Sequence, residues 1–255
     1  MSEPTLLVTN DDGAWADGLR ALAEAARELG NVWVFAPDSE QSGVGHALSL
    51  RHPLRVRELD DQFYSVSGSP ADCVYVALNH FLDEPPALCL SGVNHGANLA
   101  DDLLYSGTVA GAVEATLCEV SSIAVSLASV EDETFDVAAD FALSVAREVL
   151  DRRLPRDSFL NINVPGGADQ DTEAVVAKLG RRNYRRGVER KDDPRGRPYY
   201  WLGGRELGFD DLPGSDCNAV TDNKITVTPV KLDLTDYEFL SELNEWNVRG
   251  WHDDG

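Results

Sequence analysis

Short apolar runs alternate with longer amphipathic stretches along the first 165 residues of the chain. Residues 5–9 are apolar, residues 18–29 place apolar side chains at helical spacing before Gly30, and residues 32–36 are again apolar. This order predicts a βαβ unit. The pattern then predicts strands at 54–57, 64–66, 87–91, 122–126 and 159–163, and helices at 69–82, 109–118 and 135–150. Such alternation is typical of a mainly parallel sheet covered by helices on both faces, so we expect an α/β, Rossmann-like three-layer fold.

The pattern changes near residue 180. A basic run at 181–186 precedes a turn-rich stretch and an aromatic segment at 199–202, which favours a β-ribbon. A strand is expected at 225–230 and a final helix around 237–246. We therefore predict an α/β core at 1–180 and an extension at 181–255 that contains the ribbon, a strand returning to the core and the last helix. Because an isolated hairpin is marginally stable in water, the ribbon should pack on its own sheet or on another subunit.

The chain is strongly acidic. Its 255 residues hold 44 Asp and Glu against 22 Lys and Arg, a formal charge of −22. Nucleic-acid polymers and anionic membranes require a basic face, so this composition argues against both as partners. Only four lysines occur, all after residue 177. A carboxylate-rich surface of this kind favours a halophilic protein over an acidic mesophilic one.

The sequence lacks features of a membrane or secreted protein. With 43% hydrophobic residues the chain can bury a core, but no apolar run approaches the length of a membrane span. Residues 1–4 lead into the first strand without a basic, apolar signal sequence, so we expect a cytoplasmic protein. The cysteines show no metal-binding spacing and are expected to be buried thiols. They are Cys73, Cys89, Cys118 and Cys217.

Two adjacent carboxylates, Asp11 and Asp12, directly follow the first strand, with Gly13 behind them. Ligands of open α/β sheets bind at the carboxyl ends of the strands, and carboxylates are hard oxygen ligands. The position therefore predicts a metal site. The alternative is a solvated turn that caps the next helix, because Asn, Asp and Gly are common in turns.

Polar side chains also follow a later strand and open a later helix. Asn94 and Asn98 come after the strand at 87–91, and residues 106–108 begin the helix at 109–118. A helix N-terminus presents free backbone N–H groups, so Ser106, Gly107 and Thr108 form a candidate phosphate site without lysine. A plain N-cap is the alternative for the serine, and left-handed loop residues for the asparagines.

Five segments in this order resemble the signature set of the SurE family. They are residues 9–13, 36–43, 68–73, 91–98 and 105–112, followed by the strand at 160–165. Members of that family are metal-dependent phosphatases that act as 5′-nucleotidases, so the resemblance implies a SurE-like fold over nearly the whole chain. The departures are small: Ser69 stands where the family often has threonine, and Ala100 where glycine is common.

The resemblance implies one divalent metal ion per subunit, Mg²⁺ or Mn²⁺, held by Asp11, Asp12, Ser42 and Asn94. It places Asn98, Ser106, Gly107 and Thr108 around the phosphate. The implied substrates are nucleoside 5′-monophosphates, with 3′-nucleotides and short polyphosphate as further candidates. The ribbon of relatives exchanges between subunits, which implies a homodimer or homotetramer.

The source of the catalytic proton transfers is left open by the sequence. Asp11 is a candidate base for the attacking water, but a metal ion that lowers the pKa of that water explains the chemistry equally well. His95 is a candidate acid for the leaving group, and His46 is treated in the same way; the alternative for each is a loop histidine bonded to backbone.

Two other classes of protein share parts of this pattern. A phospho-acceptor signalling module also has an acidic pair after its first strand, but it needs a later aspartate and a nearby lysine that are missing here. A catalytically silent nucleotide-binding protein has the same residues. Phosphate release from nucleoside monophosphates with and without Mn²⁺ separates the three.

Overall fold

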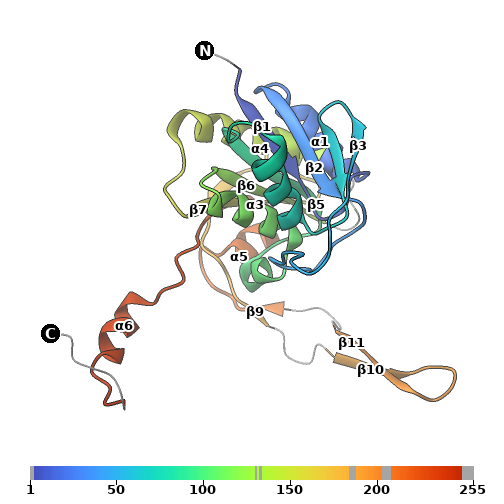
Figure 1. Cartoon of the computed structure of the whole chain (residues 1–255). Helices are drawn as coiled ribbons and strands as arrows, with labels where there is room; N and C mark the ends of the chain where they lie inside the picture. Colours follow the sequence, from blue (N-terminus) through green and yellow to red (C-terminus); the bar gives the residue numbers. More distant parts are fainter. Residues whose placement is uncertain (1–2, 130, 132–133, 184–187, 203–207, 249–255) are drawn as a thin grey trace.

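A twisted sheet covered by helices on both faces forms the body of the molecule in the computed structural model (Figure 1). The structure describes residues 3–129, 131, 134–183, 188–202 and 208–248. The sheet consists of β1 (Thr5–Thr9), β2 (Asn31–Pro37), β3 (Val56–Asp60), β4 (Phe63–Val66), β5 (Leu88–His95), β6 (Ser122–Ala128), β7 (Ser158–Pro165), β8 (Ala174–Val176) and β13 (Ile225–Lys231). The helices are α1 (Asp17–Ala26), α2 (Pro70–Val76), α3 (Gly107–Leu117), α4 (Phe135–Arg152), α5 (Asp216–Thr221) and α6 (Tyr237–Leu243), with a π-helical turn η1 (Ala77–Phe81) and a 3-10 turn η2 (Ala100–Leu104).

The described strands of the sheet run in the order β3-β4-β2-β1-β5-β6-β7-β13-β8. Pairs from β4 through β2, β1, β5 and β6 to β7 are parallel, whereas β3 with β4 and β13 with β7 are antiparallel. The predicted three-layer α/β fold with a mainly parallel sheet is confirmed. Since β1, β2 and β5 are adjacent and parallel, the loops after them meet at one edge.

The central strands are buried on both faces. In β1, Leu6 and Val8 face the cluster that includes α1 and α4, whereas Leu7 faces the cluster beneath α2 and α3. All three side chains are fully buried. Successive side chains of a strand point to opposite faces of the sheet, and both faces are covered here, so all three residues are apolar.

Several element boundaries differ from the predicted ones. The helix expected at 69–82 begins as predicted, with Ser69 as N-cap, but α2 ends at Val76 and the π-helical turn η1 follows. The helix expected to reach residue 29 ends at Ala26, after which tighter turns bond Leu29 N–H to the Ala26 carbonyl. Strand β5 continues to His95 instead of ending at 91, with a shift in register against β6.

The C-terminal region forms small β-pairs and one strand of the main sheet. Strands β10 (Val188–Asp192) and β11 (Pro198–Leu202) make an antiparallel ribbon, and β9 (Arg182–Asn183) pairs with β12 (Gly208–Phe209). The ribbon and α6 extend away from the body (Figure 1). Part of the basic run at 181–186 lies outside the described residues. Among the described helices, none is both long and apolar enough to cross a membrane.

Candidate active site at the carboxyl edge of the sheet

The chain turns sharply after β1 and presents two carboxylates at the sheet edge. The side-chain amide of Asn10 donates to the Gly13 carbonyl at 3.1 Å, and its oxygen accepts from Gly13 N–H at 3.2 Å. Gly13 has a φ of 101°, which a residue with a side chain rarely adopts. These two hydrogen bonds close a turn that contains Asp11 and Asp12, and they fix the backbone of both residues.

Asp11 is almost fully buried, with 4% of its surface exposed. Its side chain accepts a hydrogen bond from the Thr108 hydroxyl, and its carbonyl accepts from Gln41 N–H at 2.7 Å. Burial raises the pKa of the Asp11 carboxyl to about 6, the Thr108 hydrogen bond opposes that rise, and the nearby charge of Asp12 adds to it. A desolvated pair of this kind is stabilised in its ionised form by a bound cation.

The N-terminus of α3 packs directly against Asp11. A Cβ added at Gly107 would lie 2.7 Å from Asp11 Cβ and 2.8 Å from Asp11 Oδ2, so only glycine allows this approach. Ser106 caps the helix, because its hydroxyl accepts from Val109 N–H at 3.0 Å. The N-cap interpretation is therefore correct, and the N–H groups of Gly107 and Thr108 begin the helix beside Asp11. These groups and the carboxylates lie next to each other.

Asp12 faces the loop at the end of β5. Its Oδ2 accepts from His95 N–H at 3.1 Å, and burial raises the pKa of its carboxyl. The neighbouring Asn94 donates its amide N–H to the Gly96 carbonyl at 2.7 Å, which leaves Oδ1 as a neutral oxygen ligand. The ring of His95 packs edge-on against Phe135, with centroids 5.7 Å apart. The hydrogen bond of His95 to Asp12 is thus made by the backbone, and the charge of the His95 ring also lowers the pKa of the Asp12 carboxyl.

Ser42 lies in the loop that contacts Asp11 through Gln41, but it is exposed and its hydroxyl donates to Glu40 at 2.9 Å. This contact does not bring the hydroxyl to either aspartate. Gly45 N–H donates to the Tyr105 carbonyl at 3.0 Å, so the same loop is also tied to the approach of α3. Ser42 would reach a metal ion beside Asp11 by turning away from Glu40.

Asn98 is held by three polar side chains of β6 and β7. Its amide donates to Ser126 Oγ at 2.9 Å, its N–H donates to Asn163 Oδ1 at 2.8 Å, and its carbonyl accepts from Asn161 and Asn163. No described contact joins Asn98 to Asp11 directly. Asn161 and Asn163 were not predicted as site residues, although their spacing of two places both on one face of a strand.

The donor set suits a small, hard divalent cation. Two carboxylates, one amide oxygen and one hydroxyl are ligands that Mg²⁺ and Mn²⁺ favour. Within the described ranges, no three His, Cys, Asp or Glu side chains cluster in a way that would hold a metal ion. The expected set contains only two residues of those types, so it relies on the neutral oxygens of Asn94 and Ser42 and on water.

A buried carboxylate that the sequence did not flag lies on α3. Glu114 forms a hydrogen bond with His46, whose Nε2 lies 2.6 Å from Glu114 Oε2. This pair fastens the 42–50 loop to α3. The sequence feature that could have indicated this contact is an acidic residue on an otherwise apolar helix face. Three of the four cysteines are buried thiols, as predicted: Cys73, Cys89 and Cys217. Cys118 is half-buried.

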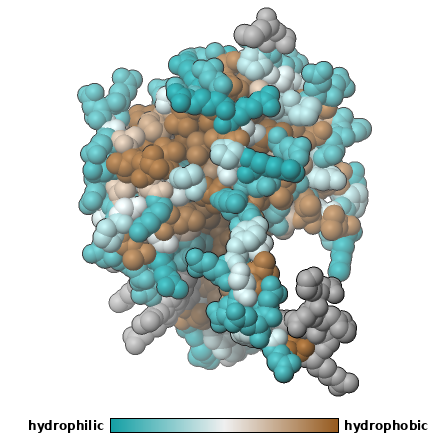
Figure 2. Space-filling model, turned by 90° about the vertical axis from the view of Figure 1, so that its left-hand side faces the viewer, coloured by the Kyte–Doolittle hydropathy of each residue, from teal (hydrophilic) through white to brown (hydrophobic). Residues whose placement is uncertain are grey.

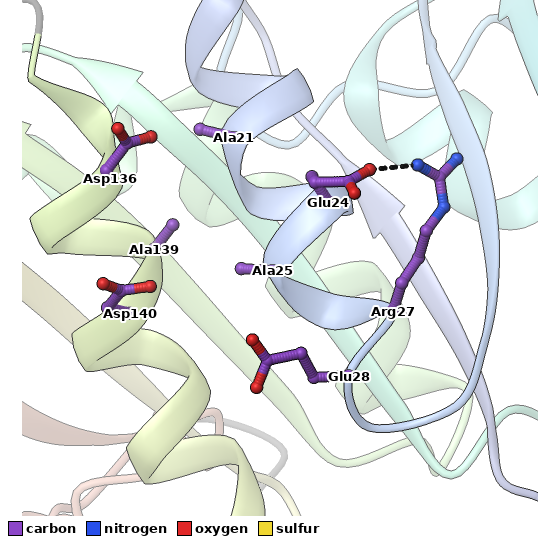
Figure 3. Close-up of a pocket in the computed structure, with 8 residues that line it drawn as sticks. All are labelled: Ala21, Glu24, Ala25, Arg27, Glu28, Asp136, Ala139 and Asp140. Atoms are coloured by element: carbon purple, nitrogen blue, oxygen red, sulfur yellow. Dashed lines mark hydrogen bonds and ion pairs between the residues drawn. The ribbon is translucent and has the colours of Figure 1, made fainter.

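A groove between α1 and α4 differs in its chemistry from the carboxyl edge of the sheet (Figure 3). Ala25 and Ala139 line it together with Asp136, Asp140 and Glu28. Its carboxylates repel an anion, and Arg27, which also lines the groove, is paired with Glu24. The groove contains none of the predicted site residues, so the carboxyl edge of the sheet remains the candidate site.

Comparisons with known proteins identify the family of this chain. The family model described as "Survival protein SurE" matches residues 6–186. The "5'-nucleotidase SurE" of Myxococcus xanthus is 49% identical over 97% of this chain and 95% of its own, and that of Geobacter sulfurreducens is 51% identical over 95% and 94%. The crystal structure of the SurE protein from Aquifex aeolicus superposes with a TM-score of 0.86 at 40% identity, covering 94% of this chain and 98% of that one. The chain therefore belongs to the SurE family.

Proposed function

We propose that this protein is a metal-dependent phosphomonoesterase that hydrolyses nucleoside 5′-monophosphates to nucleoside and phosphate. The observation that carries the proposal is the contact between Asp11 and the N-terminus of α3, which sets a cation-binding carboxylate beside an anion-binding helix end. Relatives named "5'-nucleotidase SurE" at about half identity support the substrate class.

Asp11, Asp12, Asn94 and Ser42 would hold one Mg²⁺ or Mn²⁺ per subunit. When bound, such an ion neutralises phosphate charge and activates water at neutral pH. Because phosphomonoesters react through a loose transition state, neutralisation and positioning supply most of the catalysis. Desolvation of Asp11 and Asp12 strengthens their attraction for the ion.

The other residues bind and orient the phosphate. Backbone N–H groups of Gly107 and Thr108 and the Ser106 hydroxyl would contact its oxygens from α3, and the Asn98 amide would contact it from the opposite loop. Thr108 donates a hydrogen bond to one oxygen of Asp11. Asp11 is the candidate base for the attacking water, and activation of that water by the metal ion is the alternative. His95, whose ring packs against Phe135, is a candidate acid for the leaving group.

Phosphate release tests the proposal. The purified protein is stripped with a chelator and supplied with AMP, GMP, CMP or UMP, with and without added Mn²⁺. Metal-dependent release of one phosphate per nucleotide is expected, while nucleotide binding without release identifies a silent binding protein and overturns the proposal. The same assay with 3′-monophosphates and tripolyphosphate determines whether those substrates are also cleaved.

We also propose that the protein is cytoplasmic, halophilic and a homodimer or homotetramer. Exposed aromatic residues on the ribbon and α6 support assembly, among them Tyr200, Trp201 and Tyr237. Figure 2 shows hydrophobic residues exposed among hydrophilic ones on one face of the molecule. Large apolar side chains left in water favour burial against another subunit.

A further inference from the structure

The segment from Asn98 to Ser106 joins two parts of the proposed phosphate site. It consists mainly of the 3-10 turn η2 and leads into α3. Ala100, its first residue, has a φ of 52°, in the left-handed region that a residue with a Cβ disfavours. The turn is therefore held in this shape by contacts from outside the segment.

A buried carboxylate of α5 provides one of these contacts. Asp216 is fully buried; its Oδ2 accepts from Ala100 N–H at 2.9 Å, and its Oδ1 accepts from Gly180 N–H at 2.7 Å. The Ala100 side chain is buried as well and clusters with Leu99 and Cys217. Asp216 thus fixes the backbone of the one left-handed residue described between Asn98 and Ser106.

Arg182 of β9 provides a second contact, to the two residues that follow Ala100 in the turn. Its Nε donates to Asp102 Oδ2 at 2.6 Å, and its backbone N–H donates to Asp101 Oδ2 at 3.1 Å. The Asp102 carbonyl in turn accepts from Ser106 N–H at 3.1 Å, immediately before α3. The side chains of Arg182 and Asp102 are both largely buried, so this ion pair is poorly screened.

We propose that Asp216 and Arg182 are positioning residues of the phosphate site. They hold the 98–106 segment so that Asn98 and Ser106 approach one phosphate from two sides. Both come from the region after residue 180, so the C-terminal region completes the geometry of a site formed by the N-terminal core. This inference rests on the proposed function, because it assigns Asn98 and Ser106 to the phosphate.

The test compares Asp216→Asn with Asp222→Asn in the full-length protein loaded with Mn²⁺. Asp222 ends the same helix and is exposed, so its variant removes an equal charge without touching the segment. Asp216→Asn should raise KM for AMP and the inhibition constant of inorganic phosphate about tenfold, because small displacements of binding groups are costly. Its Mn²⁺ affinity, measured by titration, should stay at the parent value, as should all constants of Asp222→Asn.

A second substitution separates positioning from general stability. Glycine adopts a left-handed φ freely, so in an Ala100→Gly background the Asp216→Asn change should raise KM less than in the parent. Equal effects in the two backgrounds would contradict the assigned role, and so would an unchanged phosphate constant in Asp216→Asn. A parent protein that releases no phosphate from any nucleotide would instead reject the proposed function.

Arg182 gives an independent readout if Asp216→Asn does not fold. Arg182→Gln should weaken phosphate inhibition while leaving Mn²⁺ affinity unchanged, and Arg182→Lys, which keeps a cation beside Asp102, should recover part of the loss. Loss of metal and phosphate binding together, or no loss in Arg182→Gln, would overturn the positioning role.

Discussion

The Thr108 hydroxyl on α3 donates a hydrogen bond to Asp11 at the tip of β1, across a separation of 97 residues. This contact joins the acidic turn to the helix N-terminus, the two halves of the proposed site. It leaves a buried carboxylate without a positive partner among its described contacts. The folded chain thus retains a charge that a bound cation would stabilise.

Asp11→Asn should abolish metal-dependent hydrolysis while leaving the metal-free fold intact or more stable. The amide can still accept from Thr108, but it removes a buried negative charge from beside Asp12. A pKa raised from 3.8 to about 6 corresponds to a stabilisation of the metal-free form at neutral pH on the order of 3 kcal/mol when that charge is removed. Thermal unfolding after chelation measures this. Wild-type turnover by the variant would reject Asp11 as a ligand.

Metal affinity should fall as the pH is lowered. Since the folded pKa of Asp11 lies above its ordinary value, this group stabilises the metal-free fold below pH 3.8, and that contribution is lost as the pH rises through about 6. A metal ion binds the ionised form, so the apparent Mn²⁺ affinity at pH 5 should be about tenfold below that at pH 7. Titration followed by electron paramagnetic resonance reports free Mn²⁺. An affinity that is flat over this interval would contradict the prediction.

Gly107→Ala should damage the site more than the fold. The new Cβ would lie under 3.0 Å from two Asp11 atoms, so Asp11 or the end of α3 must move. Alanine favours a helix by about 1 kcal/mol over glycine, which limits the loss of stability. We expect kcat/KM to fall at least about tenfold, since reacting groups tolerate little displacement. Gly208→Ala, at an open position, is the matched control and should keep parent kinetics.

Local patterns predicted the elements that are buried on both faces, and missed the contacts that the fold makes over long distances. Strand β1 was recognisable because Leu6, Leu7 and Val8 are all apolar. The extension of β5 past residue 91 was not recognisable, because a glycine such as Gly92 usually indicates the end of a strand. In the structure, the absence of a side chain at Gly92 allows the strand to approach the Val125 carbonyl closely. A Cβ at this position would lie 2.3 Å from the carbonyl oxygen.

In the candidate site, too, local patterns could be predicted from the sequence and long-range contacts could not. The acidic pair and the Asn94 segment could be expected at one edge of the sheet because each follows a predicted strand. No periodicity in the sequence indicates that Asp216 meets Ala100, 116 residues away. The sequence at 215–216 resembles an ordinary helix start, and Ser215 does cap α5. The role of Asp216 becomes visible only when the backbone of η2 is in place.

Low salt should destabilise the protein. With a net charge of −22, repulsion between carboxylates grows as screening weakens. The Debye length rises from about 3 Å at about 1 M salt to about 30 Å at about 10 mM. The melting temperature should therefore drop steadily across this series, with sucrose as a control for nonionic effects. A constant melting temperature would reject the halophilic interpretation.

Removing the ribbon should reduce the size of the assembly. Strands β10 and β11 leave Tyr200 and Trp201 each 59% exposed, and a lone hairpin cannot bury such side chains. Exchange of a short element between subunits is a low-cost route to closed oligomers. A variant that replaces residues 188–202 with a short Gly-Ser linker should have a smaller mass by light scattering in high salt. It should retain Mn²⁺ affinity, because the proposed ligands lie at the sheet edge.

Arg195→Gln, in the turn between the two strands, is the control and should keep the parent mass. If the deletion variant has the same mass as the parent, the ribbon does not mediate assembly, and α6 with its exposed Tyr237 becomes the next segment to remove.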